Sequence, residues 1–361
     1  MIRLEPRLAP SRIWSFLAPL AAVGATLVGG SIIFSLLGKN PIDVLLTIFW
    51  SPLFDPNMSA YARPQLLVKA TPLILIAAGL AVGFKAGIWN IGAEGQYIMG
   101  AIAGGAVALA FYPAEAWFIF PLMVAAGALG GVAWAMIPAA LKIRFNTNEI
   151  LVSLMLVYIA AQFLAAVSLG ALRNPEGSGF PGSRNLQYYD SASNPELLAG
   201  TGVHWGGMAA VAALACLYLL MRRHIMGFHL RLAGESPRAA RFSGARPALL
   251  VAFCLGVSGG LAGLAGLFEL AGPSGQISID FNVGYGFTAI IVAFLGRLNP
   301  IGILLAGLLV ALTYIGGEMA QFMLGLPRSA IQAFQGMLLF FLLAMDLFLH
   351  YRIVFRTGAK A

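Results

Sequence analysis

Charge is scarce in this sequence. Only 10% of the 361 residues are Asp, Glu, Lys or Arg, whereas 60% are hydrophobic. A soluble domain carries about 25% charged residues, so this chain lacks the polar side chains that would cover a globule in water. The composition excludes a large soluble protein and predicts an all-α polytopic membrane protein.

Cysteine and histidine are also rare. The two cysteines, Cys216 and Cys254, lie in separate apolar runs, and there are only four histidines. The sequence contains no Cys/His cluster for a metal, no G-x-x-x-x-G-K-[ST] loop for ATP phosphates and no G-x-S-x-G nucleophile motif. Nor does it offer paired catalytic groups for an intramembrane enzyme. We therefore expect that this chain is not an enzyme, holds no metal and binds no ATP itself.

Apolar runs, in contrast, are abundant. About 20 residues cross a bilayer core as a helix, and the 43 glycines suit close helix packing in lipid. The second and eighth runs are doubtful, because Lys69 and Pro72 interrupt the former and the latter is short. The ten predicted spans are 13–37, 66–84, 92–111, 117–141, 150–172, 205–221, 248–270, 285–296, 301–321 and 330–349.

The basic residues indicate orientation. The net charge of +8 is spread over short segments between apolar runs, which favours a membrane rather than a nucleic-acid partner. With the N-terminus inside, 16 of the 22 Lys and Arg residues are cytoplasmic, so both termini are predicted to be cytoplasmic. Segments 38–65 and 173–204 are then long outer loops, the second either disordered or a docking surface, and 222–247 is a long inner segment.

Two parts of the chain contain equal numbers of predicted spans. Residues 66–172 and 248–349 each contain four spans and enter the membrane from opposite sides. This arrangement predicts an inverted repeat of four plus four helices, with short or broken members, within one transmembrane domain, 1–361.

One polar patch interrupts the apolar sequence at "GIWNIGAEGQYIMGA", residues 87–101. If the patch is helical, Asn90 and Glu94 share a helix face. An ionisable group at membrane depth usually faces the protein interior or a water-filled cavity. Alternatively, Glu94 caps a helix start at the interface, where an acidic group favours the helix dipole. The sequence leaves both hypotheses open.

Two further segments pose a similar choice. "NTNEI", residues 146–150, either contributes Asn148 and Glu149 to a polar route or caps the fifth span. "GPSGQISIDFNVGYGFTAIIVAFLG", residues 272–296, is either an outer loop followed by a tilted helix or a short helix that begins partway into the bilayer.

The inner segment contains "GESPRAARFSG", residues 234–244. Ser236 is a good N-cap, Pro237 suits the first helical position and Gly244 suits the position after the last. A helix over 237–243 is marginal alone in water, so it favours docking to a partner surface. The alternative is an ordinary basic loop.

These four motifs, in this order, resemble the permease subunits of bacterial ABC importers for nucleosides, which are served by lipoproteins of the BMP family. That group belongs to the ribose and branched-chain amino acid permease superfamily. The resemblance implies an inner-membrane permease that forms the translocation pathway for a nucleoside. It also implies a second permease, which would be a paralogue, a separate ATPase that binds ATP and Mg, and an extracytoplasmic binding lipoprotein.

The resemblance also assigns residues to roles. The expected substrate pathway comprises Trp89, Asn90, Glu94, Gln96, Asn148, Glu149, Asp280, Asn282, Tyr285, Phe287 and Thr288. The expected ATPase-coupling residues are Gly234, Glu235, Ser236, Pro237, Arg238, Ala239, Ala240 and Arg241.

Two alternative functions remain. One is an ABC permease for a ribose-like sugar. The other is an ion-coupled secondary transporter, which would need acidic residues at mid-membrane, and only Glu94 and Glu269 are candidates. The capped inner helix favours an ATPase partner over this second alternative.

Overall fold

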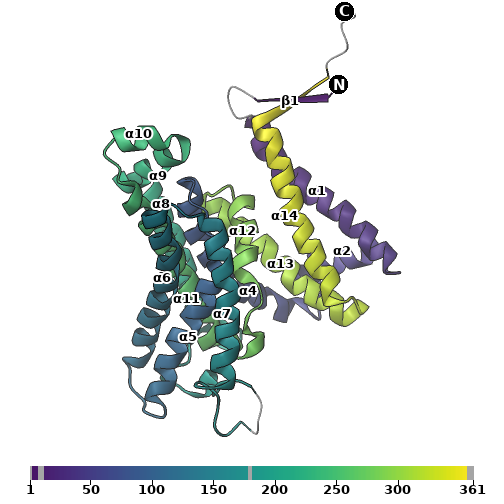
Figure 1. Cartoon of the computed structure of the whole chain (residues 1–361). Helices are drawn as coiled ribbons and strands as arrows, with labels where there is room; N and C mark the ends of the chain where they lie inside the picture. The colour runs from purple at the N-terminus through teal and green to yellow at the C-terminus, as the bar shows by residue number, and fades with distance from the viewer. Residues whose placement is uncertain (1, 7–11, 178–180, 356–361) are drawn as a thin grey trace, which may run out of the picture. The chain divides into compact units, whose positions relative to one another are not determined.

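The computed structural model describes residues 2–6, 12–177 and 181–355, and most of these residues are helical (Figure 1). The chain divides into two compact units, one made of Met1–Ala62 with Leu312–Ala361 and the other of Arg63–Ala311. We describe the two units separately.

The first unit brings both ends of the chain together. Helices α1 and α14 lie side by side, and the Phe34 and Phe334 rings pack 5.8 Å apart in its core (Figure 1). The strands β1 and β4 pair antiparallel. The elements of this unit are β1 (Ile2–Pro6), α1 (Arg12–Leu36), α2 (Pro41–Phe49), α3 (Ser51–Phe54), the end of α13 (Pro300–Leu324), α14 (Arg328–His350) and β4 (Tyr351–Phe355).

The predicted outer segment 38–65 is mostly helical, and its outer placement stays a prediction. It contains α2, α3 and the start of α4 (Ser59–Lys85). The Asn40 side chain accepts a hydrogen bond from the Ile42 backbone N at 3.1 Å, and Pro41 occupies the first turn of α2. These capping signals start a helix too short to appear as a membrane span in the sequence.

The second unit is a bundle built around α5, α6 and α11, with short elements at its ends. Its helices are α4, α5 (Ala93–Phe111), α6 (Ile119–Phe145), α7 (Glu149–Leu169), α8 (Gly206–Arg223), α9 (Ile225–Glu235), α10 (Pro237–Phe242), α11 (Pro247–Glu269), α12 (Tyr285–Leu295) and the start of α13. Its short elements are η1 (Leu186–Tyr188), β2 (Glu196–Leu198), β3 (Val203–His204), the π-helical η2 (Leu270–Ser274) and η3 (Ile279–Phe281).

Glycines let the three central helices touch backbone to backbone. A Cβ on Gly100 of α5 would lie 2.2 Å from the Cα of Gly263 of α11. A Cβ on Gly131 of α6 would lie 2.1 Å from the carbonyl oxygen of Gly259 of α11. Small residues allow this approach between helices in lipid. The packing brings the start of α5 against α11 and thereby positions the polar patch.

All ten predicted spans correspond to helices. Eight helices among the described residues are long and apolar enough to cross a membrane, and α5 and α12 account for the other two. The predicted interruption of the second span is wrong, because α4 runs unbroken through Lys69 and Pro72. A proline kinks but does not end a membrane helix when neighbouring groups satisfy the freed backbone. The eighth span is confirmed as short, since α12 has only 11 residues.

The two predicted repeats each contain four helices. Residues 66–172 contain α4 to α7, and residues 248–349 contain α11 to α14. Their opposite entry into the membrane stays a prediction.

Candidate functional site

Three buried side chains close a hydrogen-bond network between the polar patch and α11. The Asn90 Nδ2 donates to the Gln96 Oε1 and to the Ser258 Oγ, both at 2.8 Å. The Gln96 Nε2 donates back to the Asn90 Oδ1 at 3.2 Å, and this oxygen also accepts from the Gly92 backbone N at 3.0 Å. Asn90 precedes α5, so the shared helix face with Glu94 does not form. The two amides satisfy each other and hold the patch on α11.

Glu94 joins α5 to the start of α12. Its side chain is fully buried, and its Oε1 accepts a hydrogen bond from the Gly284 backbone N at 2.9 Å. Its Oε2 accepts another from the Gly286 backbone N. Gly284 has the left-handed φ of 85°, and a Cβ on Gly286 would lie 2.2 Å from the Glu94 backbone N. Glu94 is therefore both buried and a helix cap, but it caps α12 rather than its own helix.

The predicted aromatic residues differ in exposure. Tyr285 is only 1% exposed and lies edge-on to Tyr97, with ring centroids 6.0 Å apart. Trp89 and Phe287 are 37% and 39% exposed. The Trp89 ring also packs on Phe84, with centroids 5.0 Å apart. Trp89 and Phe287 therefore keep part of their surface uncovered in this chain, whereas Tyr285 does not.

The remaining residues predicted in 272–296 also differ in exposure. Asp280 and Asn282 are exposed, at and just after η3. Thr288 is buried in α12, where its Oγ1 donates to the Gly284 carbonyl oxygen at 3.1 Å. The buried Thr288 thus stabilises the start of α12, whereas the exposed Asp280 and Asn282 precede this helix in the sequence.

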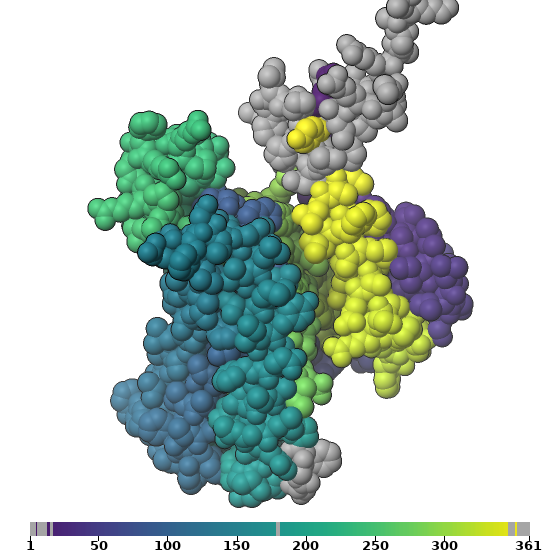
Figure 2. Space-filling view, viewed as in Figure 1, coloured from purple at the N-terminus to yellow at the C-terminus, as the bar shows by residue number. Residues whose placement is uncertain are grey.

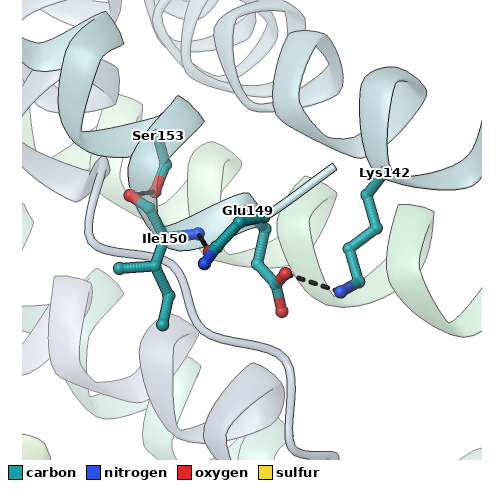
Figure 3. A network of polar contacts seen from close by, with 5 residues as sticks. Lys142, Glu149, Ile150 and Ser153 are labelled. Atoms are coloured by element: carbon teal, nitrogen blue, oxygen red, sulfur yellow. Dashed lines mark hydrogen bonds and ion pairs between the residues drawn. The ribbon is translucent and has the colours of Figure 1, made fainter. Parts of the chain in front are cut away.

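The turn between α6 and α7 forms a second polar cluster (Figure 3). The Lys142 Nζ and the Glu149 Oε2 lie 2.5 Å apart, and the exposed Asn148 side chain caps α7 by accepting from the Ile150 backbone N at 2.9 Å. Ser153 links this turn to the patch, because its Oγ accepts from the Ile91 backbone N at 3.2 Å. The structure thus shows the capping role that the sequence left open for "NTNEI".

Sequence reasoning missed Ser153 and Ser258. Both are 1% exposed and lie within apolar spans. The sequence shows a hydroxyl side chain within each of these apolar spans, which is the one sign of a buried polar contact. It does not show which distant group the hydroxyl binds.

The 222–247 segment contains two helices rather than the one predicted. The His224 Nδ1 accepts from the Met226 backbone N at 3.1 Å and starts α9. The Ser236 Oγ accepts from the Ala239 backbone N at 3.4 Å and starts α10, and Gly244 follows α10 with a φ of 87°. The predicted caps of α10 are confirmed, and Figure 2 shows the segment within a green lobe that stands out from the unit.

One exposed aromatic marks the surface of α10. Phe242 is 94% exposed, whereas Ala240 is only 3% exposed and packs inside the lobe. Close packing anchors the lobe to α4, because a Cβ on Gly234 would lie 2.1 Å from the Lys85 carbonyl oxygen. Arg238 and Arg241 are exposed on the same short helix.

The described parts of the 173–204 segment, 173–177 and 181–204, are bound to the residues that follow α11. The Asn194 backbone N donates to the Ala271 carbonyl oxygen at 2.8 Å. The Ser183 backbone N donates to the Ile277 carbonyl oxygen at 2.9 Å, and the Ser183 Oγ accepts from the Ile277 backbone N at the same distance. These bonds make 181–194 part of the packed structure. The prediction of a disordered or docking loop also covered 178–180, which lie outside the described residues.

An ion pair orders the same segment. Arg184 donates two hydrogen bonds to the Glu176 carboxylate, at 3.0 and 3.1 Å, and its guanidinium lies 4.4 Å from the centroid of the Tyr112 ring. The hydrogen bonds that Arg184 donates to the Glu176 carboxylate raise the pKa of Arg184. Such a bidentate pair fixes geometry more than it stabilises the fold at an exposed position.

The residues described by the structure contain no group of three His, Cys, Asp or Glu side chains that could hold a metal ion. At the patch itself, the side-chain polar atoms of Asn90, Glu94 and Gln96 are bound within the protein, whereas Trp89 and Phe287 keep part of their surface uncovered.

The family and the relatives to which this chain is similar are permease components of transporters. The sequence model of a family described as the permease component of the branched-chain amino acid transport system matches residues 64–343. The glucose ABC transporter permease protein TsgB13 of Haloferax volcanii is 33% identical over 364 residues, covering 98% of this chain and 93% of its own.

Bacillus subtilis has two similar proteins, both named guanosine ABC transporter permease proteins. NupP is 28% identical over 326 residues, covering 89% of this chain and 90% of its own. NupQ is 28% identical over 262 residues, covering 68% of this chain and 78% of its own.

Proposed function

This chain belongs to the family of permease components of branched-chain amino acid transport systems, and on that premise we propose that it is a membrane-spanning permease subunit of an ABC importer for nucleosides. The observation that carries the proposal is its similarity to NupP over nine-tenths of both chains. The proposal places the protein in the inner membrane, with both termini in the cytoplasm, consistent with the distribution of its Lys and Arg residues.

A glucose-like sugar is the second candidate substrate. The similarity to TsgB13 supports it, because that relative shares 33% of aligned residues with this chain. The exposed rings of Trp89 and Phe287 suit a nucleoside, because a flat base offers a face on which an aromatic side chain can stack.

The residues of the polar patch support the pathway in different ways. We infer that Asn90, Glu94 and Gln96 stabilise the protein around the translocation pathway rather than contact the substrate, because their polar atoms are already bound within the protein. The substrate then meets the exposed side chains, which are Trp89, Asp280, Asn282 and Phe287. Weak contacts suit an importer, which must release what it admits.

Transport assays on the assembled transporter in proteoliposomes test the function. We expect uptake of labelled guanosine that requires ATP and Mg inside, persists after the membrane potential is collapsed, and is competed by other nucleosides but not by glucose. Uptake of glucose instead would support the second candidate. Uptake driven by an ion gradient without ATP would contradict both ABC assignments.

The proposal includes three protein partners. A second permease is supported by NupP and NupQ, two guanosine permease proteins from one bacterium that both resemble this chain. A separate ATPase that binds ATP and Mg would dock on α10, and a binding lipoprotein would meet the 173–204 segment.

The exposed Phe242 should be central to ATPase docking. Replacing it with serine removes a large aromatic side chain from the surface of α10, and aromatic anchors typically contribute about 2 kcal/mol or more to an interface. We expect F242S to weaken ATPase association by roughly thirtyfold and to reduce substrate-stimulated ATP hydrolysis. Co-purification and ATPase assays measure both effects.

The control for this test is Phe228→Ser on α9. Phe228 is 46% exposed but lies outside α10. An equal loss in both variants, or no loss in F242S, would contradict docking through α10. Ala240 is unsuitable for substitution, because it is buried and a charged side chain there would disrupt the lobe itself.

The 173–204 segment should contact the binding lipoprotein. Tyr188 in η1 is 87% exposed, whereas Ser183 is buried, so a cysteine in place of Tyr188 is the better probe. We expect this cysteine to cross-link to the binding protein during turnover, and a cysteine in place of Phe242 not to do so. Cross-linking at neither position, with cross-links elsewhere on the outer side, would contradict this contact.

A further inference from the structure

A small cavity lies where the 173–204 segment meets the end of α11. Its volume is about 20 Å³, and α4, α8 and α11 form most of its walls. Val68 and Phe268 contribute apolar sides, while Thr71, Asn194, His204 and Glu269 contribute polar groups. All of these residues belong to the second unit.

Asn194 is the most unusual residue of this cavity. It is only 3% exposed, and within the described parts of the chain neither its Oδ1 nor its Nδ2 has a hydrogen-bond partner. Its backbone N donates to the Ala271 carbonyl oxygen, which holds the backbone at this position. A buried amide with no partner costs free energy and requires an explanation.

Two other polar groups reach the same cavity. The His204 Nδ1 is buried and also lacks a hydrogen-bond partner among the described residues. Glu269, at the end of α11, contributes a carboxylate, and Lys69 of α4 is its charged neighbour. The Thr71 hydroxyl already donates to the Leu67 carbonyl oxygen at 2.9 Å.

The size and chemistry of the cavity select its occupant. A space of about 10–15 Å³ admits one water molecule, so a cavity of about 20 Å³ has room for one. Water can accept a hydrogen bond from the Asn194 Nδ2 and donate to the Asn194 Oδ1, the His204 Nδ1 or the Glu269 carboxylate. A cation fits less well, because the Asn194 Nδ2 and the Lys69 ammonium would repel it.

We propose that this cavity holds one buried water molecule that joins Asn194 and His204 of the 173–204 segment to Glu269 of α11. The direct hydrogen bonds described above secure residues 183–194 to residues 271–277. The water extends this attachment to His204, just before α8. The π-helical turn η2 directly follows Glu269, and turns of this kind interrupt regular helices and often mark functional sites. The inference does not depend on which substrate is carried.

X-ray radiolytic footprinting of the intact, reconstituted transporter tests the proposal. Hydroxyl radicals formed from a bound water oxidise adjacent side chains even where bulk solvent does not reach. Phe268 lines the cavity and is 8% exposed, whereas Phe281 is 3% exposed and is not among the lining residues. We expect Phe268 to be oxidised several-fold faster than Phe281, with slow exchange of the incorporated oxygen when the bulk is changed to H₂¹⁸O.

A variant separates water from residual solvent exposure. Asn194→Leu replaces the amide by an apolar side chain of similar size, and we expect oxidation of Phe268 to fall to the rate of Phe281. Equal slow oxidation of both rings in the unmodified protein would overturn the proposal. Oxidation of Phe268 that depends on sodium, compared with N-methylglucamine, would show a cation site and overturn it as well.

Discussion

Glu94→Gln should reduce both the stability of the second unit and nucleoside uptake. The Glu94 carboxylate accepts hydrogen bonds from the Gly284 and Gly286 backbone N atoms. A glutamine keeps one acceptor oxygen but turns an NH₂ group toward the other donor. Losing a buried charge-assisted bond costs about 1.5–3 kcal/mol, so we expect the start of α12 to loosen and uptake to fall by roughly tenfold or more. Thermal unfolding and uptake assays measure the two effects.

Glu149→Gln is the matched control. Glu149 also begins a helix, but its partner Lys142 is 27% exposed, so its loss should cost about 1 kcal/mol or less. If Glu94→Gln left both stability and uptake unchanged, the bond to α12 would not matter. If it left stability unchanged and abolished uptake, the carboxylate would act on the substrate directly, as one sequence hypothesis proposed.

Gly263→Val should prevent the second unit from folding stably. A Cβ at this position would lie 2.3 Å from the Gly127 carbonyl oxygen and 2.9 Å from the Gly131 Cα, both backbone atoms of α6. Backbone atoms cannot move aside, so overpacking should cost about 3 kcal/mol or more. We expect little monodisperse protein by size-exclusion chromatography of detergent-solubilised membranes.

The same helix offers the control, Gly256→Ala. A Cβ on Gly256 would meet only the Met136 Cε, at 3.4 Å, which is the end of a flexible side chain. Alanine is also favoured over glycine in a helix by up to about 1 kcal/mol, so this variant should be as stable as the parent or more so. If both variants behaved alike, close backbone contact between α6 and α11 would not determine stability.

The sequence predicts where the helices lie far better than it predicts which residues they contact. Apolar runs locate every span, and Ser236 with Gly244 marks both ends of α10. The sequence also indicates that Glu94, if buried, must have hydrogen-bond or charge partners, because an unpaired charge within the membrane is costly. It does not show that the donors are Gly284 and Gly286, about 190 residues later, since any backbone N–H would serve.

The same limit applies to the segments between the predicted spans. Segments 38–65 and 173–204 are too polar or too short to predict a span, so the sequence offers only composition there. The hydrogen bonds of Ser183 and Asn194 to Ile277 and Ala271 depend on chain segments that meet only after folding.

The attachment of α12 through backbone atoms bears on how this protein could evolve. Glu94 binds Gly284 and Gly286 without using any side chain of α12, and the neighbouring Asn282 and Phe287 are exposed. Substitutions at 282 or 287 would therefore alter the surface beside α12 without loosening its start. Residues at these two positions can therefore diverge between relatives while the attachment of α12 to Glu94 is kept.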